Sequence, residues 1–235
     1  ILGGFRFGVG ERAFFDIAFV SGDISVVDVF SGCSSDVVEV WGRRFEVSVE
    51  GAEFVPVKSL SIGFRDPGRQ LIKLVFYTPV LLSTKLMAPP LDSFGKKVAG
   101  LGSSYVLYPS TGHICSYLSK LCRSVEGKTV FGGPTPEWSD YFLGRLCEVV
   151  LVPVDVDTAP KTVRYDEKRS IRGFTGYAIL RLGIKRKRIV EAVDRLFAYA
   201  NIFGIGKSRS IGFGVTGVTT VEYRHKAVDT ESEQQ

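Results

Sequence analysis

The chain contains 235 residues, of which 45% are apolar and 23% are charged, and its net charge is +5. This composition excludes an intrinsically disordered chain, because the apolar residues are numerous enough to form a core. The four cysteines are too few for a disulfide scaffold, and no two of them have Cys-x-x-Cys spacing. We find no signal peptide and no run of about 18 uncharged apolar residues, so we expect a cytoplasmic protein.

The N-terminal 70 residues suggest the end of one domain followed by a connection. A glycine-rich loop at 3–10 precedes a strand-like run at 13–20, and the chain starts at Ile1 without an initiator Met. A similar loop at 203–214 precedes a second β-rich run near the C-terminus, and such repeats often mark two copies of one domain plan. We therefore expect residues 1–20 to be the last loop and strand of a truncated first domain, in a piece of a longer protein. We expect residues 21–70 to be a β-rich connecting segment, with strands at 26–30, 37–49 and 54–57.

The remaining elements predict one complete domain over residues 71–225. The pattern begins with a buried strand at 71–77 and a long loop at 88–109. A helix follows, with Ser110 or Thr111 as N-cap and Gly127 at its end. The next predicted elements are a loop at 131–140, a strand at 146–154, two strands at 162–165 and 174–182 around a basic turn, a helix ending at Gly204, and a last strand at 215–223. This β-α-β-β-α-β order is typical of an α+β, ferredoxin-like domain, and we expect residues 226–235 to be a disordered tail.

The C-terminal glycine loop does not have the spacing of a nucleotide-binding motif. Gly206-Lys207-Ser208 resembles the end of a phosphate loop, but the first glycine of that motif is absent, and the predicted loop follows a helix and precedes a strand. Two interpretations remain. The glycines could serve a tight connection that needs positive φ, or the loop could grip an anion with its backbone N–H groups and with Lys207 and Arg209.

The basic excess of the chain is confined to one window. Residues 161–188 contain 10 Lys and Arg against 2 Asp and Glu. A basic cluster is typical of a protein that binds a phosphate-rich partner, although a solvated charged face is the common alternative. Tyr165, Phe174 and Tyr177 lie within this window and could either stack on bases or pack in a sheet.

Four stretches of the sequence resemble a known family. The pattern at 204–214, with Gly204, Gly206, Gly212 and Gly214 around Lys207 and Arg209, is similar to the C-terminal glycine-rich signature of the RAMP superfamily. More narrowly, it resembles the CRISPR repeat-processing endoribonucleases, which have two tandem ferredoxin-like (RRM-like) domains. The stretches at 8–15, 76–79 and 172–177 resemble other segments of these enzymes, in the same order.

The resemblance implies an endoribonuclease that cuts CRISPR precursor RNA at repeat hairpins without a metal or other cofactor. In this chemistry the 2′-hydroxyl of one nucleotide attacks its own phosphate and leaves a 2′,3′-cyclic phosphate. The implied partners are the RNA hairpin and other CRISPR-associated subunits, with a monomer or homodimer as the oligomeric state. The expected RNA-binding residues are Arg164, Lys168, Arg169, Arg172, Lys185, Arg186, Lys187, Arg188, Gly204, Gly206, Lys207, Ser208, Arg209, Gly212 and Gly214.

The catalytic residues are less well defined by the sequence. The histidine that the family often uses lies in the first domain, so it cannot be carried over to this chain. His113, at the start of a predicted helix, is the candidate that remains, although surface histidines without a chemical role are common. The alternative is a non-catalytic RAMP scaffold subunit that binds guide RNA. A generic RRM-like protein is a third interpretation, but it would not need the paired glycine loops.

Overall fold

The computed structural model describes residues 36–40, 43–47, 55–91, 97–98, 100, 102, 104–164 and 170–223. The chain divides into two units, one formed by residues 12–60 and the other by residues 1–11 and 61–235. The predicted first-domain remnant at 1–20, the predicted strand at 26–30 and the predicted tail at 226–235 lie outside the described residues.

The smaller unit contains a β-hairpin where the sequence suggested one strand. Strands β1 (Asp36–Val40) and β2 (Arg43–Val47) pair antiparallel, with Asp36 opposite Val47 and Val40 opposite Arg43. The chain reverses between them, so the predicted continuous strand at 37–49 is wrong. A short 3-10 helix, η1 (Val57–Ser59), follows Pro56 near the predicted strand at 54–57.

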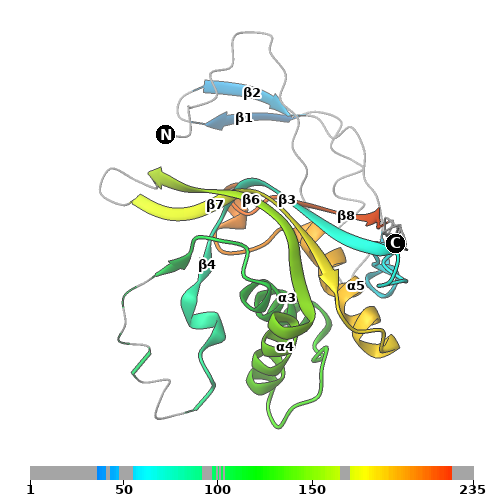
Figure 1. Ribbon diagram of the computed structural model, residues 1–235. Helices are drawn as coiled ribbons and strands as arrows, with labels where there is room; N and C mark the ends of the chain where they lie inside the picture. The colour runs from blue at the N-terminus through cyan, green and yellow to red at the C-terminus, as the bar shows by residue number, and fades with distance from the viewer. Residues whose placement is uncertain are drawn as a thin grey trace, which may run out of the picture. The chain divides into compact units, whose positions relative to one another are not determined.

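The larger unit is built on a four-stranded antiparallel sheet with the strand order β6-β7-β3-β8. Its helices lie on the same side of the sheet (Figure 1). The chain passes from β3 through α3 to β6 and β7, and then through α5 to β8, which is the ferredoxin-like order. The predicted fold class is therefore confirmed. The bounds are β3 (Gln70–Val80), α3 (Thr111–Glu126), β6 (Leu151–Arg164), β7 (Ser170–Leu182), α5 (Lys187–Phe203) and β8 (Thr216–Glu222).

Predicted capping residues mark both ends of α3 and the C-terminal end of α5. The Ser110 side chain accepts a hydrogen bond from the His113 backbone N–H at the start of α3, and Gly127 ends that helix with φ 68°. Gly204 ends α5. The apolar faces of both helices pack on the sheet, where Leu118, Val193 and Phe197 are fully buried.

An additional helix, α4 (Pro136–Val150), stands where the sequence suggested a loop and then a strand. Thr135 caps it by accepting from the Trp138 backbone N–H, and Pro136 occupies the first helical position, which proline favours. The predicted loop at 131–140 is therefore wrong from Pro136 onward, and the predicted strand at 146–154 is wrong up to Val150. The β-branched run that indicated a strand contributes its first residues to α4, and β6 begins only at Leu151.

Helices α3 and α4 pack closely because two glycines face each other. A Cβ atom on Gly144 would lie 2.9 Å from the carbonyl oxygen of Gly112. Asp140 is buried in the same contact and accepts from the Ser119 hydroxyl at 2.6 Å and from the Arg123 guanidinium at 2.8 Å. The packing thus joins α4 firmly to the ferredoxin-like core.

Short elements complete the region between β3 and α3. Strand β4 (Leu82–Ser83) pairs with β5 (Tyr105–Val106), and the 3-10 helix η2 (Thr84–Met87) follows β4. None of the helices in the described part of the chain is long and apolar enough to cross a bilayer.

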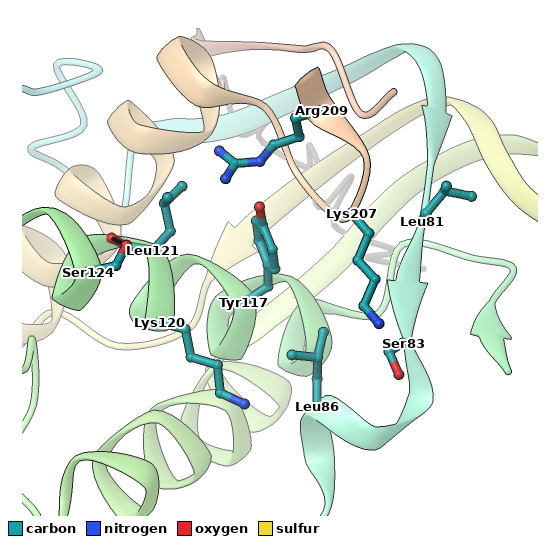
Figure 2. A pocket seen from close by; sticks show the side chains of 9 residues that line it. All are labelled: Leu81, Ser83, Leu86, Tyr117, Lys120, Leu121, Ser124, Lys207 and Arg209. Carbon is teal, nitrogen blue, oxygen red and sulfur yellow. Dashed lines mark hydrogen bonds between the residues drawn. The ribbon is translucent and has the colours of Figure 1, made fainter. Parts of the chain in front are cut away.

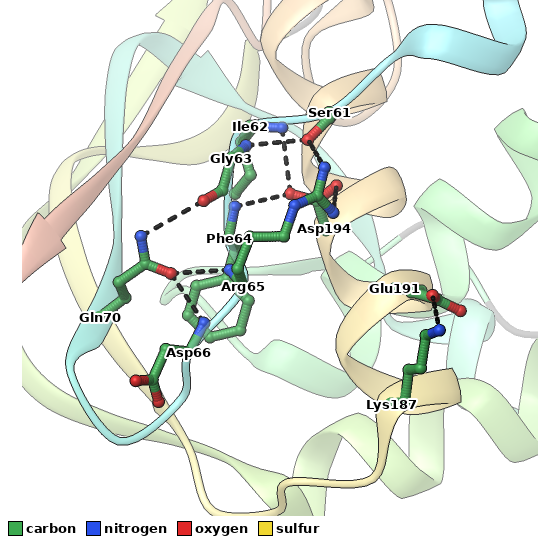
Figure 3. Close-up of polar contacts among 10 residues, drawn as sticks. All are labelled: Ser61, Ile62, Gly63, Phe64, Arg65, Asp66, Gln70, Lys187, Glu191 and Asp194. Carbon is green, nitrogen blue, oxygen red and sulfur yellow. Dashed lines mark hydrogen bonds and ion pairs between the residues drawn. The ribbon is translucent and has the colours of Figure 1, made fainter.

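A buried carboxylate fixes the segment that leads into β3. Asp194, on α5, accepts hydrogen bonds from the backbone N–H of Ile62 at 3.2 Å and of Phe64 at 2.8 Å, and its other oxygen lies 3.5 Å from the Arg65 guanidinium (Figure 3). The Phe64 side chain is fully buried. Asp194 therefore holds the chain against α5 before it enters the sheet.

Candidate nucleic-acid interface

The glycine loop between α5 and β8 is packed tightly against the end of β3. Gly206 has φ 100°, and a Cβ atom there would lie 2.8 Å from the carbonyl oxygen of Leu81. Gly214 has φ 69°, and a Cβ atom there would overlap the carbonyl oxygen of Ile205. Both positions therefore require glycine for conformation and for space.

Much of the loop backbone is already hydrogen bonded within the protein. The N–H groups of Ile205, Lys207 and Gly214 donate to the carbonyl oxygens of Gly214, Leu81 and Pro79, at 2.8, 3.0 and 3.0 Å. The tight-connection interpretation thus accounts for the glycines, and these N–H groups do not form an anion nest. The capacity to bind an anion lies in the side chains that the loop carries.

Two of these side chains, Lys207 and Arg209, line a pocket beside α3 (Figure 2). The pocket has a volume of about 290 Å³. Its lining residues are Leu81, Ser83, Leu86, Tyr117, Lys120, Leu121, Ser124, Lys207 and Arg209. We call it the basic pocket, because it combines three cations with three hydroxyl groups, and no acidic residue of the described part of the chain lines it.

Arg209 is held in place by the protein. One guanidinium nitrogen donates to the carbonyl oxygen of Phe203 at 3.0 Å, and the guanidinium carbon lies 5.7 Å from the centre of the Tyr117 ring. Burial raises the pKa of Tyr117, while the Arg209 charge and a hydrogen bond with the Gly206 backbone oppose that rise. Tyr117 is therefore a neutral hydrogen-bonding group at neutral pH.

The end of β6 and the start of β7 lie beside the glycine loop. Leu81, Val163 and Phe213 form a buried cluster that joins the end of β3, the hairpin and the loop. Beyond this cluster Arg172 is exposed on β7, and Arg164 ends β6 opposite Ser170. Lys168 and Arg169 lie outside the described residues.

Four further basic residues of the sequence window lie at the opposite end of β7. Lys185, Arg186, Lys187 and Arg188 are exposed between the end of β7 and the first turn of α5. Ten residues of extended chain separate Arg172 from the end of β7 at Leu182, which corresponds to about 33 Å. The basic window is therefore divided between two ends of the domain.

The cations at the α5 end are already engaged in part. The Arg188 guanidinium carbon lies 5.0 Å from the centre of the Phe131 ring. Lys187 lies 3.9 Å from a Glu191 carboxylate oxygen (Figure 3). The glycine-loop end, with its pocket and its hairpin, is the better candidate for a nucleic-acid interface.

Comparisons with known proteins show the family to which this fold belongs. The family model described as CRISPR-associated endoribonuclease Cas6 matches residues 74–216, which span the sheet from β3 to the start of β8. The chain belongs to the Cas6 family.

Two curated relatives are the CRISPR-associated endoribonucleases Cas6 1 and Cas6 2 of Saccharolobus solfataricus. The first is 25% identical over 193 residues, which cover 80% of this chain and 64% of the relative. The second is 27% identical over 180 residues, which cover 74% of this chain and 59% of the relative. The chain thus spans less than two thirds of the length of either Cas6 relative.

Solved Cas6 structures share the fold. A Thermus thermophilus Cas6 (TTHB231) in a product complex superposes with a TM-score of 0.51 at 23% identity, covering 70% of this chain and 55% of that one. A second Cas6 (TTHA0078), in a substrate mimic complex, gives a TM-score of 0.54 at 13% identity. The superposition covers 85% of this chain and 76% of that one.

His113 occupies a structural position in this Cas6-family chain. Its Nδ1 lies 2.8 Å from the Ser110 hydroxyl oxygen, and the ring also forms a hydrogen bond with the Thr84 backbone. Burial lowers the pKa of His113, and this effect outweighs the Thr84 hydrogen bond and the Glu148 charge, which raise it. The ring therefore ties the start of α3 to η2, and its catalytic role stays a prediction.

The lowered pKa of His113 predicts a pH-dependent contribution to stability. The folded protein binds the proton less readily than the unfolded chain, so stability falls as the pH falls below the unfolded value of about 6.5. The change His113→Gln removes this titration. We expect the variant to lose less free energy of unfolding than the wild type between about pH 7.5 and about pH 5.5, measured by urea titration. Equal losses in the two proteins would contradict this expectation.

Phe174 and Tyr177 are the aromatic residues of the basic window that the structure describes. Phe174 is fully buried and contacts Phe76 edge to face, with ring centres 5.1 Å apart. Of the two interpretations, sheet packing is therefore the one that holds for Phe174. The Tyr177 hydroxyl donates to Asp155 on β6 at 3.1 Å, which places a carboxylate beside that ring. Tyr165 lies outside the described residues.

The α3 wall of the basic pocket was missed by sequence reasoning. Tyr117, Lys120 and Ser124 have the spacing of one helix face, and that pattern was the available signal. Tyr117 also has the spacing of the apolar face of this helix, so its role in the pocket is not evident from the sequence. Tyr117 packs beside the glycine loop, which lies more than 80 residues later in the sequence. The contact between Leu81 and Gly206 brings the two together.

Proposed function

We propose that the chain binds CRISPR precursor RNA at repeat hairpins and cuts it. The observation that carries this proposal is the concentration of cations at the glycine-loop end of a Cas6-family domain, where the basic pocket adjoins the β6–β7 hairpin. Two similar proteins are described as endoribonucleases, and two similar structures are described as product and substrate mimic complexes.

The proposed reaction is an internal transesterification. The 2′-hydroxyl oxygen attacks the adjacent phosphorus as its proton passes to a base, and the bond from phosphorus to the 5′ oxygen breaks. The 5′ oxygen takes up a proton from an acid, and the upstream product ends in a 2′,3′-cyclic phosphate. Cations lower the energy of this path by stabilising the extra negative charge on the phosphorane.

In this proposal Lys207, Arg209 and Arg172 hold the RNA backbone, and they specify position without reading bases directly. Lys185, Arg186 and Arg188 would contact only RNA that extends along the length of the sheet. The general base and acid are not assigned, and His113 remains the candidate within this chain.

A cleavage assay tests the proposal. A CRISPR repeat hairpin labelled at its 5′ end is incubated with the chain in EDTA, and the products are separated on a gel. We expect one cut, with a product end that resists phosphatase until acid opens the cyclic phosphate. A matched RNA with a 2′-deoxy nucleotide at the cut should bind equally and stay intact. Cutting of that deoxy RNA would contradict the mechanism, and absence of binding would contradict the function.

A second candidate is a scaffold subunit that binds guide RNA without cutting it. The contacts of the His113 ring with the Ser110 hydroxyl and the Thr84 backbone favour this reading, because they already give the candidate base a structural role. Salt-dependent binding without a cut in the same assay would support the scaffold. A clean cut would exclude it.

A further inference from the structure

The basic pocket has two walls from distant parts of the sequence. Lys207 and Arg209 come from the glycine loop, whereas Tyr117, Lys120 and Ser124 come from the exposed side of α3. Figure 2 shows Lys120 and Lys207 extending from these opposite walls, with the Tyr117 hydroxyl between the loop and the helix. Leu81, Leu86 and Leu121 form the apolar remainder of the lining.

The charge of this pocket is not neutralised by the described part of the protein. Within the described ranges Lys120, Lys207 and Arg209 form no ion pair, and Arg209 uses one nitrogen for the Phe203 carbonyl oxygen. Hydrogen bonds with its own backbone N–H and with Thr135 are the main causes that lower the pKa of Glu137, to which the Lys120 charge adds, but Glu137 does not line the pocket. Three cations around one concave surface attract an anion.

The Tyr117 hydroxyl complements these charges. It lies beside the Arg209 guanidinium and the Gly206 backbone, and the tyrosine is more than half covered by its surroundings. A neutral hydroxyl that can donate a hydrogen bond suits an oxygen acceptor, as do the ammonium groups. The small size of the pocket and its mixture of leucine and cationic groups fit a single phosphate with the edge of a sugar.

We propose that the basic pocket binds one phosphodiester group of the RNA strand, with Lys120 of α3 as a phosphate ligand opposite Lys207. This inference rests on the proposed function, because RNA is the ligand. It extends the RNA path from the glycine loop onto the helical side of the domain. The open side of the sheet, where Asp155 contacts Tyr177, is the less favourable path for a polyanion.

The first test compares Lys120→Ala with Lys128→Ala, which removes the same charge from an exposed position just after α3. Binding of a CRISPR repeat RNA is measured by fluorescence anisotropy over a range of salt concentrations. We expect Lys120→Ala to weaken binding about five-fold and to reduce the slope of log affinity against log salt by about 0.7 to 0.9, as expected for one lost phosphate contact. Lys128→Ala should bind as the wild type does, and Lys120→Arg should retain most of the affinity.

The second test identifies the phosphate. Single methylphosphonate linkages, which lack the negative charge, are placed in turn along the RNA. One linkage should weaken wild-type binding but have no further effect on Lys120→Ala, since both changes remove the same contact. If inorganic phosphate competes for the wild type with no such linkage found, the pocket binds free phosphate, and the inference is overturned.

The outcomes separate this inference from the proposed function. Wild-type protein that fails to bind RNA would contradict the proposed function itself. Wild-type protein that binds RNA, together with equal affinities for Lys120→Ala and Lys128→Ala, would overturn only the inference about α3. Thermal melts of both variants confirm that each is folded before binding is compared.

Discussion

Replacing Gly214 with alanine is expected to destabilise the protein by about 3 kcal/mol. The new methyl group would overlap the Ile205 carbonyl oxygen, and alanine is strained at φ 69°. The loop can relieve the overlap only by breaking the hydrogen bonds that join Gly214 to Ile205 and Pro79. The melting temperature should therefore fall by about 10 °C, and RNA affinity should fall as Lys207 and Arg209 move.

Gly212→Ala is the matched control, because it is in the same loop at φ 87° but has no atom within 4 Å of the added Cβ. Its only unfavourable effect is the strained backbone conformation of alanine, so we expect the free energy of unfolding to fall by about 1 kcal/mol. Calorimetry of the two variants measures the difference. Equal melting temperatures would show that the close approach of Gly214 to Ile205 does not matter for stability.

Replacing Asp194 with alanine is also expected to lower the free energy of unfolding by about 3 kcal/mol. The variant leaves the N–H groups of Ile62 and Phe64 without their acceptor, and Phe64 is buried. Asn at this position keeps one acceptor oxygen for both N–H groups and gives up only the contact with Arg65, which is largely exposed. We therefore expect Asp194→Asn to cost about 1 kcal/mol or less.

Urea titration gives the free energies, and hydrogen exchange at Ile62 and Phe64 gives a local measurement. Loss of protection at these two amides in Asp194→Ala, with protection retained in Asp194→Asn, is the expected pattern. Equal stability of the two variants would mean that the carboxylate charge, and not acceptance from the backbone, holds the segment on α5.

The parts of the fold that were predictable are those set by local chemistry. Helix α3 starts after Ser110 and ends at Gly127, and α5 ends at Gly204, because caps satisfy backbone groups within a few residues of themselves. Helix α4 was not predictable from its β-branched end. Its start was marked by Thr135 and Pro136, whereas its C-terminal part is supported by a tertiary contact, the packing of buried Cys147 against Cys115 of α3.

The part of the candidate site that could be predicted is likewise the part with a local sequence pattern. Lys207 and Arg209 stood out because the glycines around them formed a recognisable pattern. Lys120 did not stand out, because it lies far from that loop in the sequence. The two come together only in the folded protein, where Leu81 pairs with Gly206 beside α3. Conversely, Arg172 and Lys185 are neighbours in the basic window, but the extended strand between them places them at opposite ends of β7.

The order of the strands also has a consequence during synthesis. Of the four strands in the sheet, β3 emerges first, yet its β8 partner ends at Glu222, about 140 residues after Val80. At typical translation rates this gap lasts roughly 7 to 30 s. During that interval one edge of the central strand has no partner, and unpaired strand edges promote aggregation. The glycine loop is completed in the same final step, so the nascent chain acquires its candidate RNA-binding surface only when that edge is closed.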